Sequence, residues 1–416
     1  MPDVLSSART GEEPLAGDVA VDPATGRPAG RAQALVLLFS SCLAVLGAVL
    51  LAPVLPRIED AFAGTPGVAT LTPVVLTAPA LVVGLTAMVA GRIVDRLGRK
   101  RLLVGAMVVY AFVGTAPLWL QSLQLIVASR VLVGLTEAAI MTCCTTLLAD
   151  YFHGSRRERY LGLQVVFTTV GATLFFGLGG ALGAQSWRTP FWLYAVSLPL
   201  AALAARYVWQ PAPQRGTAGT ALPGLPWRRL AAPVGVTLLG GLVFYVLIVE
   251  LSFKLDSIGV ESTGTIGAVS AIGSLGTAAG AFSFGRLARL GPVVTVPLAF
   301  GVSGIGLLGL ALAQAVPVVV VSAVVTGLGN GLLLPALLTW ALAPLTFEQR
   351  GRGTGVWTSA MFIGQFVCPL VVLALSGAID GLGSALAVLG AVSLAAAVGV
   401  RSTRAGRAAD PALASR

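Results

Sequence analysis

The feature of this sequence that most constrains its fold is a succession of apolar stretches separated by short polar turns. Each stretch is about 20 residues long, which is the length of helix that spans the hydrocarbon core of a bilayer. We therefore predict an all-α membrane protein with twelve transmembrane helices, approximately at residues 33–55, 68–90, 102–120, 123–149, 161–183, 190–208, 231–252, 264–284, 292–312, 316–343, 354–376 and 380–400.

Composition agrees with a bilayer as the solvent. Hydrophobic residues make up 56% of the chain and charged residues only 11%, whereas soluble domains carry about 25% charged residues. Cys42, Cys143, Cys144 and Cys368 lie in apolar stretches without CxxC spacing, and His153 is the single histidine. We therefore expect no metal site, no cofactor and no catalytic constellation of an enzyme.

Most of the positively charged residues lie in polar segments on one side of the predicted membrane. The formal net charge is +10, and 23 of the 27 Lys and Arg residues fall on one side of the predicted membrane, together with both termini. Positively charged loops stay in the cytoplasm. We predict a multi-pass protein of the cell membrane with both termini cytoplasmic, and we expect no nucleic-acid partner.

An internal repeat divides the chain into two halves. At an offset of 193 residues, Arg96-Leu97-Gly98 matches Arg289-Leu290-Gly291, and Gly162 matches Gly355. Transporters commonly bind substrate between such repeats, so two pseudo-symmetric six-helix bundles are predicted. The expected domains are a disordered cytoplasmic tail (1–32), an N-terminal bundle (33–208), a cytoplasmic linker (209–230), a C-terminal bundle (231–400) and a basic cytoplasmic tail (401–416).

The loop between the second and third stretches, GRIVDRLGRKR at residues 91–101, resembles the signature loop of the major facilitator superfamily. Arg130 with Gly134 is similar to a second motif of that family. The resemblance covers residues 33–400 and implies the major facilitator fold. Within the family the chain resembles the twelve-span drug/proton antiporters, although Phe175-Phe176 stands where their fifth helix has Gly-Pro.

The resemblance also implies contacts for the signature loop. In the family, the loop acid faces the start of helix 11 and a loop arginine pairs with an acid that ends helix 4. Asp95 is thus expected near Gly353, and Arg99 near Asp150. We interpret the loop as a gate that favours the outward-open state, and the alternative is a topology signal alone. The residues of this gating motif are Gly91, Asp95, Arg96, Gly98, Arg99, Lys100 and Asp150.

Glu137 stands in the middle of the fourth stretch. An ionised carboxylate there costs at least about 2.5 kcal/mol, so such residues are functional by default. Arg130 lies seven residues earlier, on the same helix face and about 10 Å away. We predict that Glu137 couples transport to protons and that Arg130 modulates it. The alternative is a structural pair that orders the N-terminal bundle.

Other polar residues in the apolar stretches are weaker candidates. Asn330 takes the position of Glu137 at the repeat offset and is expected to be a neutral substrate contact, with Gln164, Thr168 and Gln365 as further residues of the substrate cavity. A second acid, Glu250, precedes Lys254 by four residues, the favoured order for an ion pair on a helix. We expect this pair at the outer surface, and the alternative is a role in transport.

These features predict a secondary active transporter that works by alternating access. No GxxxxGK[ST] string is present, so the energy must come from an ion gradient or from the gradient of the solute itself. The expected partners are a small, amphipathic organic substrate, protons and the lipid bilayer, and the carrier is expected to be monomeric. Proton-coupled multidrug efflux by antiport is the first interpretation. The alternative is proton-coupled import of a neutral or weakly acidic metabolite.

Overall fold

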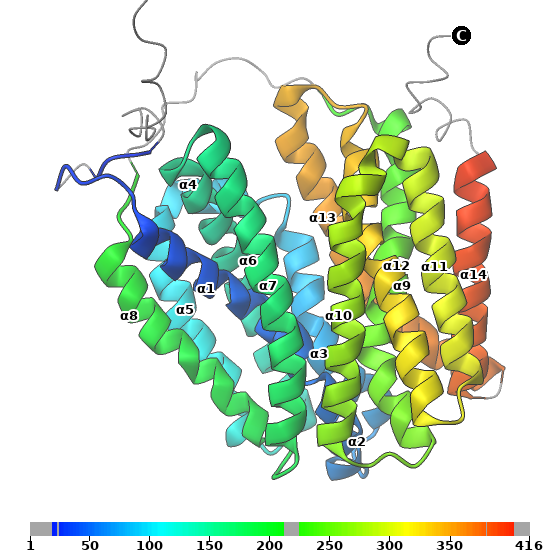
Figure 1. The fold of residues 1–416 in the computed structure, drawn as a ribbon. Helices are drawn as coiled ribbons and strands as arrows, with labels where there is room; N and C mark the ends of the chain where they lie inside the picture. Colours follow the sequence, from blue (N-terminus) through cyan, green and yellow to red (C-terminus); the bar gives the residue numbers. More distant parts are fainter. Residues whose placement is uncertain (1–18, 23–24, 212–223, 380, 403–416) are drawn as a thin grey trace, which may run out of the picture.

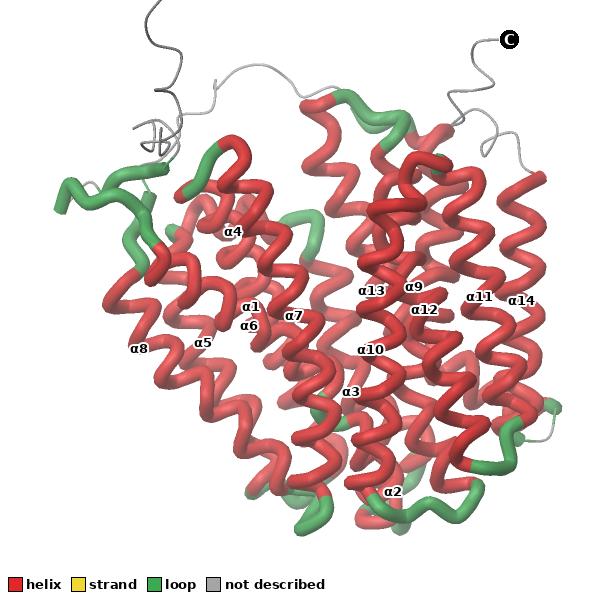
Figure 2. The backbone as a smooth tube through the Cα atoms, in the orientation of Figure 1, coloured by secondary structure: helices red, strands yellow, loops and turns green. Residues whose placement is uncertain are grey.

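The computed structural model of the chain describes residues 19–22, 25–211, 224–379 and 381–402 (Figure 1). Its regular elements in these ranges are helices, joined by short loops (Figure 2). The α-helices are α1 (Arg31–Val49), α2 (Leu55–Ala61), α3 (Val68–Thr86), α4 (Ala90–Leu97), α5 (Arg99–Thr115), α6 (Leu123–Tyr151), α7 (Gly154–Gly183), α8 (Ser197–Tyr207), α9 (Trp227–Ser257), α10 (Thr263–Leu287), α11 (Pro292–Leu312), α12 (Val316–Leu342), α13 (Phe347–Ala378) and α14 (Leu382–Ser402).

Eleven helices of the described ranges are long and apolar enough to cross a membrane. They correspond to eleven of the twelve predicted spans, and the first of them continues from α1 through the 3-10 turn η1 (Ala52–Val54) into α2. The remaining span, predicted at 190–208, begins as the 3-10 segment η3 (Thr189–Val196) and runs directly into α8. The predicted all-helical membrane fold is thus confirmed.

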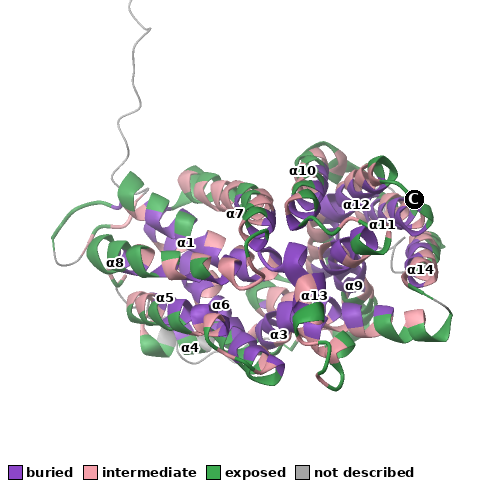
Figure 3. Cartoon of the chain, turned by 90° about the horizontal axis from the view of Figure 1, so that it is seen from below, coloured by how far each residue is buried: buried purple, intermediate pink, exposed green. Residues whose placement is uncertain are grey.

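The helices form two bundles that stand side by side, α1–α8 in one and α9–α14 in the other (Figure 3). We call the end at which α1 begins and α14 ends the basic end, because most arginines of the described turns lie there, and the other end the opposite end. The two bundles meet where α7 packs against α10 and where α3 packs against α13. These four helices therefore line the interface between the halves.

The repeat found in the sequence has a structural counterpart in two glycines. Gly98 precedes α5 with a φ of +83°, and Gly291 precedes α11 with a φ of +72°. Glycine adopts this left-handed region without the steric cost that other residues bear. Equivalent turns therefore introduce the equivalent helices of each half.

At the opposite end, the halves are joined backbone to backbone. A Cβ added to Gly180 of α7 would lie 2.8 Å from the Cα of Gly267 of α10. The hydroxyl of Thr263 donates a hydrogen bond of 3.0 Å to the Gly180 carbonyl. Nearer the middle of the same helices, the hydroxyls of Thr173 and Ser274 lie 3.0 Å apart. The opposite end is thus closed in this structure.

The predicted disordered tail is folded over part of its length. Val19 pairs with Phe152 in a short antiparallel bridge, and the Ala20 amide donates to the Tyr151 carbonyl over 2.9 Å. This contact satisfies backbone groups that the end of α6 leaves unpaired. The composition of the tail does not reveal such a backbone contact. Residues 1–18 of the predicted tail, 212–223 of the linker and 403–416 of the basic tail lie outside the described residues.

Candidate functional site

Glu137 lies in α6 and is 4% exposed. Its carboxylate projects onto Gly47 of α1, into the space that a Cβ on Gly47 would occupy. Among the described residues, none forms a hydrogen bond with its Oε1 atom. The predicted intramembrane acid is therefore buried between two helices of the N-terminal half, shut off from solvent in this conformation.

Arg130 is completely buried two turns away on α6. Its guanidinium donates to the Tyr194 hydroxyl over 2.8 Å and to the Gly114 carbonyl over 3.4 Å. It also lies over the rings of Tyr194, at 4.8 Å, and Phe191, at 5.5 Å. These hydrogen bonds hold α6 against α5 and η3, and among the described residues Arg130 forms no ion pair with Glu137.

Three tyrosines of the apolar stretches, Tyr110, Tyr194 and Tyr245, are buried in the structure and are not among the predicted site residues. Tyr110 donates to the Leu43 carbonyl of α1 over 2.6 Å, and its ring lies 5.1 Å from that of Tyr194. Tyr245 of α9 donates across the interface to the Ala48 carbonyl over 3.0 Å. A buried tyrosine hydroxyl needs a hydrogen-bond partner. A tyrosine within an apolar stretch was therefore the sequence feature that could have identified these residues.

Gln164 belongs to a polar cluster between α1, α6 and α7. Its side-chain amide donates to the hydroxyl of Ser41 over 2.8 Å and to that of Thr145 over 3.1 Å. Thr145 is exposed and Gln164 partly so. Thr168, one turn further along α7, donates to the Gln164 carbonyl over 3.0 Å. The structure thus brings these two predicted cavity residues together.

Two other predicted cavity residues are differently placed. Asn330 is 2% exposed, its Oδ1 accepts from Ser303 over 3.0 Å, and its Nδ2 donates to the Phe244 carbonyl over 3.1 Å. The amide therefore fastens α12 to α11 and α9, and the structure does not present it to a substrate. Gln365 is buried in α13. The repeat offset did not predict these partners of Asn330.

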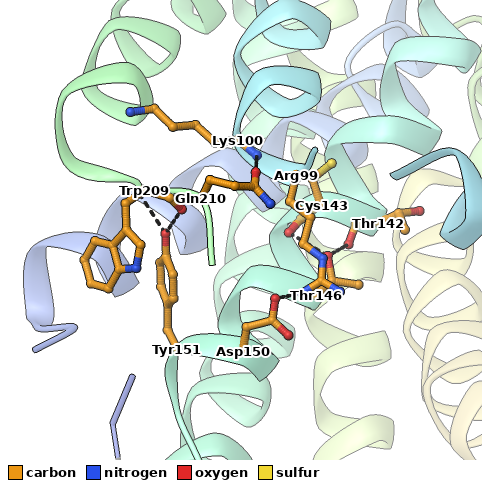
Figure 4. Close-up of polar contacts among 9 residues, drawn as sticks. All are labelled: Arg99, Lys100, Thr142, Cys143, Thr146, Asp150, Tyr151, Trp209 and Gln210. Atoms are coloured by element: carbon orange, nitrogen blue, oxygen red, sulfur yellow. Dashed lines mark hydrogen bonds and ion pairs between the residues drawn. The ribbon is translucent and has the colours of Figure 1, made fainter. Parts of the chain in front are cut away.

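The predicted contact between Arg99 and Asp150 is present. Arg99 begins α5, Asp150 lies in the last turn of α6, and their side chains form an ion pair (Figure 4). Both side chains are mostly buried. The pair joins two helices of the N-terminal half at the basic end.

The turn at Gly98 is also fixed by the segment that follows α8. The side-chain oxygen of Gln210 accepts from the Lys100 amide over 3.1 Å (Figure 4). The neighbouring Trp209 stacks on Tyr151 with ring centres 4.4 Å apart, and its amide donates to the Tyr151 hydroxyl over 2.9 Å. The start of the predicted linker is therefore bound to the gating motif.

The remaining members of the gating motif lie on or beside α4. Gly91 and Arg96 are exposed. The side chain of Asp95 lies outside the described residues, and so does its expected contact with α13. The chain just before α4 does approach α13, because a Cβ on Gly355 would lie 3.5 Å from the Ala87 carbonyl oxygen. The gating motif is therefore adjacent to the C-terminal half.

The expected surface ion pair of Glu250 and Lys254 is wrong. Both residues are buried, Glu250 at 5% exposure. Lys254 donates to the Ala311 carbonyl of α11 over 3.4 Å. No ion pair joins the two residues within the described part of the chain. The helical spacing allowed the pair, but the packing of α9 against α11 and α13 determines where each side chain points.

Comparison with known proteins agrees with this architecture. The family model described as Major Facilitator Superfamily matches residues 37–255 and 234–414. The 3-(3-hydroxy-phenyl)propionate transporter of Escherichia coli (strain K12) is 28% identical over 67% of this chain and 70% of its own. A tetracycline resistance protein (class C) of Escherichia coli is 32% identical over 39% of this chain and 41% of its own. The gallate transporter of Pseudomonas putida is 34% identical over 28% of this chain and 24% of its own.

Solved structures show the same fold. A bacterial homolog of the human lysosomal transporter Spinster, in an inward-facing and unoccupied conformation, superposes with a TM-score of 0.69 at 15% identity, over 92% of this chain and 98% of its own. The human organic anion transporter MFSD10 superposes with a TM-score of 0.66 at 18% identity, over 89% and 99%. These relatives are membrane transporters and not enzymes. The chain belongs to the Major Facilitator Superfamily and is a multi-pass secondary transporter of small organic molecules.

Proposed function

We propose that this protein is a proton-coupled carrier in which Glu137 binds the coupling proton. The observation that carries the proposal is the buried Oε1 of Glu137, which no described residue hydrogen-bonds. An ionised carboxylate without a partner inside the membrane costs several kcal/mol. The occluded group is therefore stable only with a proton, and it can exchange that proton only in a conformation that opens the contact with Gly47.

The competing interpretation is that Glu137 and Arg130 form a structural pair. The contacts of Arg130 favour the coupling role, because its guanidinium is engaged by Tyr194 and by backbone carbonyls. Arg130 then acts on Glu137 only through their electrostatic interaction. In our proposal it tunes how readily Glu137 gives up its proton.

The two halves supply the alternating access. Closure at the opposite end rests on the approach of Gly180 to Gly267, and in our proposal the ion pair of Arg99 with Asp150 stabilises the gating motif at the basic end. Positively charged loops are retained in the cytoplasm, so the basic end would face the cytoplasm of a cell membrane. A single chain supplies both halves, which supports a monomeric carrier.

For the substrate we propose a small aromatic molecule bound between the halves. Gln164 and Thr168 would contact it, because they lie on the partly exposed side of α7 beside Thr145. Two relatives are named as transporters of the aromatic acids 3-(3-hydroxy-phenyl)propionate and gallate. A weak acid that enters together with a proton would need no fixed cation for charge balance.

The direction of transport has support on both sides. Efflux, the first interpretation of the sequence, agrees with the likeness to a tetracycline resistance protein over 39% of the chain. Import agrees with the longer alignment to the 3-(3-hydroxy-phenyl)propionate transporter, over 67%, and with Phe175-Phe176 in place of the antiporter Gly-Pro. We therefore favour import of a weakly acidic aromatic compound.

The experiment is transport of radiolabelled 3-(3-hydroxyphenyl)propionate by the purified protein in liposomes. The expected result is accumulation when the outside is acidic, abolished by a protonophore. Tetracycline in the same liposomes tests the alternative, since antiport would move it toward the acidic side. Movement of neither compound under either gradient would contradict the proposed substrate class.

A further inference from the structure

Glu250 is a second acid within the membrane-spanning helices, and it has no role in the coupling proposed for Glu137. It lies in α9 on the C-terminal side of the interface, five residues beyond Tyr245 toward the opposite end. Its side chain is 5% exposed, and within the described ranges no hydrogen bond reaches it. An ionised carboxylate in this position, with no hydrogen-bond partner, is unfavourable compared with the neutral acid.

The cations of α2 and of the last turn of α9 are engaged elsewhere: Arg57 of α2, which packs against α9, donates to the Gly183 carbonyl of α7 over 2.9 Å. Lys254, one turn away, directs its ammonium group to the Ala311 carbonyl. Glu59 lies on α2 of the N-terminal half, which packs against α9, so an ionised Glu250 and an ionised Glu59 would repel each other. Cys368, a further titratable residue, is buried in α13, which also packs against α9.

The remaining helices packed against α9 add no cation at this level. Helices α11 and α12 contain no charged residue, and those of α10, α13 and α14 lie close to the basic end. Toward the opposite end, α2, the last turns of α9 and the following loop carry more acids than cations, with Asp60 on α2, Asp256 at the end of α9 and Glu261 in the loop. These acids and Glu250 thus lie on α2, on α9 and in the loop that follows α9, at the opposite end of the two halves.

We propose that Glu250 is a second proton-binding site, which holds a proton while the opposite end is closed and which, once ionised, repels Glu59 and opens that end. The proton leaves to water at the opposite end, beside Asp256 and Glu261. This inference rests on the proposed carrier function, but it does not require Glu137 to be the coupling acid.

Proton binding is tested by infrared spectroscopy of the purified protein. The measurement uses a Glu137→Gln background, so that Glu137 cannot contribute a signal. We expect a carbonyl band of a protonated carboxylic acid that disappears in Glu250→Gln. The matched control, Glu261→Gln, changes an exposed acid of the same region and should leave the band in place. A band that survives Glu250→Gln would overturn the proposal, whatever the result for Glu137.

The opening step is tested by pulsed electron paramagnetic resonance. Spin labels are placed at Gln185 and Thr265, exposed positions of the two halves at the opposite end. The partly exposed Cys42 is replaced by Ser in this protein. We expect the distance between the two labels to increase as the pH rises. Glu250→Gln should abolish this change. Glu59→Gln, which removes the repulsion and keeps Glu250, should reduce it. The same pH-dependent separation in all three proteins would contradict the role of Glu250.

Discussion

The carboxylate of Glu137 occupies the space that the missing side chain of Gly47 leaves on α1. The two helices can therefore hold an acid between them only because residue 47 has no Cβ. This relationship connects a residue proposed to carry protons with a helix that Tyr245 binds from the other half. Movement of α1 relative to α6 would then expose Glu137 and break a contact between the halves in one step.

Gly47→Ala should displace the Glu137 carboxylate. A Cβ at this position overlaps the flexible end of the glutamate side chain, so we expect a loss of about 1–3 kcal/mol, typical of overpacking, together with a changed pH dependence of transport. Gly105→Ala on α5, where a Cβ meets nothing within 4 Å, is the control. An unchanged pH profile in Gly47→Ala would show that the position of the carboxylate is unimportant.

Tyr194→Phe should destabilise the N-terminal half. It removes the hydroxyl that accepts from Arg130 over 2.8 Å, and an unsatisfied buried donor costs about 1–3 kcal/mol. The midpoint of thermal unfolding should fall for Tyr194→Phe and stay the same for Tyr207→Phe, because Tyr207 is exposed. Equal midpoints for the two variants would contradict the structural role of the Arg130 contact.

Gly180→Ala should hinder closure of the opposite end. Its Cβ would collide with the backbone of α10, which cannot move aside as a flexible side chain can. We expect slower transport, and faster reaction of a cysteine placed at Ser274 with a thiol reagent from the opposite side. Gly177→Ala, three residues earlier on the same helix and with nothing within 4 Å of the added Cβ, should behave like the parent protein in both measurements.

Asp150→Asn should slow transport by weakening the gating motif. It breaks the ion pair with Arg99, and partly exposed pairs contribute about 1 kcal/mol. We therefore expect a several-fold lower rate with little change in substrate affinity. Exchange of the two residues, Arg99→Asp with Asp150→Arg, should restore part of the rate. If the exchanged pair restored none of the transport rate, the result would contradict a role of the ion pair. Transport by Asp150→Asn at the rate of the parent protein would contradict it as well.

The spans and the pair of Arg99 with Asp150 were predictable for different reasons. Bilayer thickness sets the length of each apolar stretch, so the helices follow from hydropathy alone. The ion pair came from the resemblance of residues 91–101 to a family motif. The repeat also matched Gly98 with Gly291, and both adopt a positive φ, which glycine does without steric cost.

Side-chain partners inside the bundles could not be predicted in the same way. Helical spacing placed Glu250 beside Lys254, yet tertiary packing gave Lys254 a carbonyl of α11. Asn330 was expected at the cavity, but it binds Ser303 and the Phe244 carbonyl. In both cases the deciding contact comes from a helix distant in sequence, and a single sequence does not reveal which helices are neighbours.

The most direct test is transport by Glu137→Gln in liposomes with an imposed pH gradient. Glutamine keeps the shape of the neutral acid and cannot release a proton. We expect this variant to exchange labelled for unlabelled substrate across the membrane at a near-normal rate, but to accumulate none in response to the gradient. Accumulation driven by the gradient to the same level as in the parent protein would contradict the assignment of Glu137 as the coupling acid.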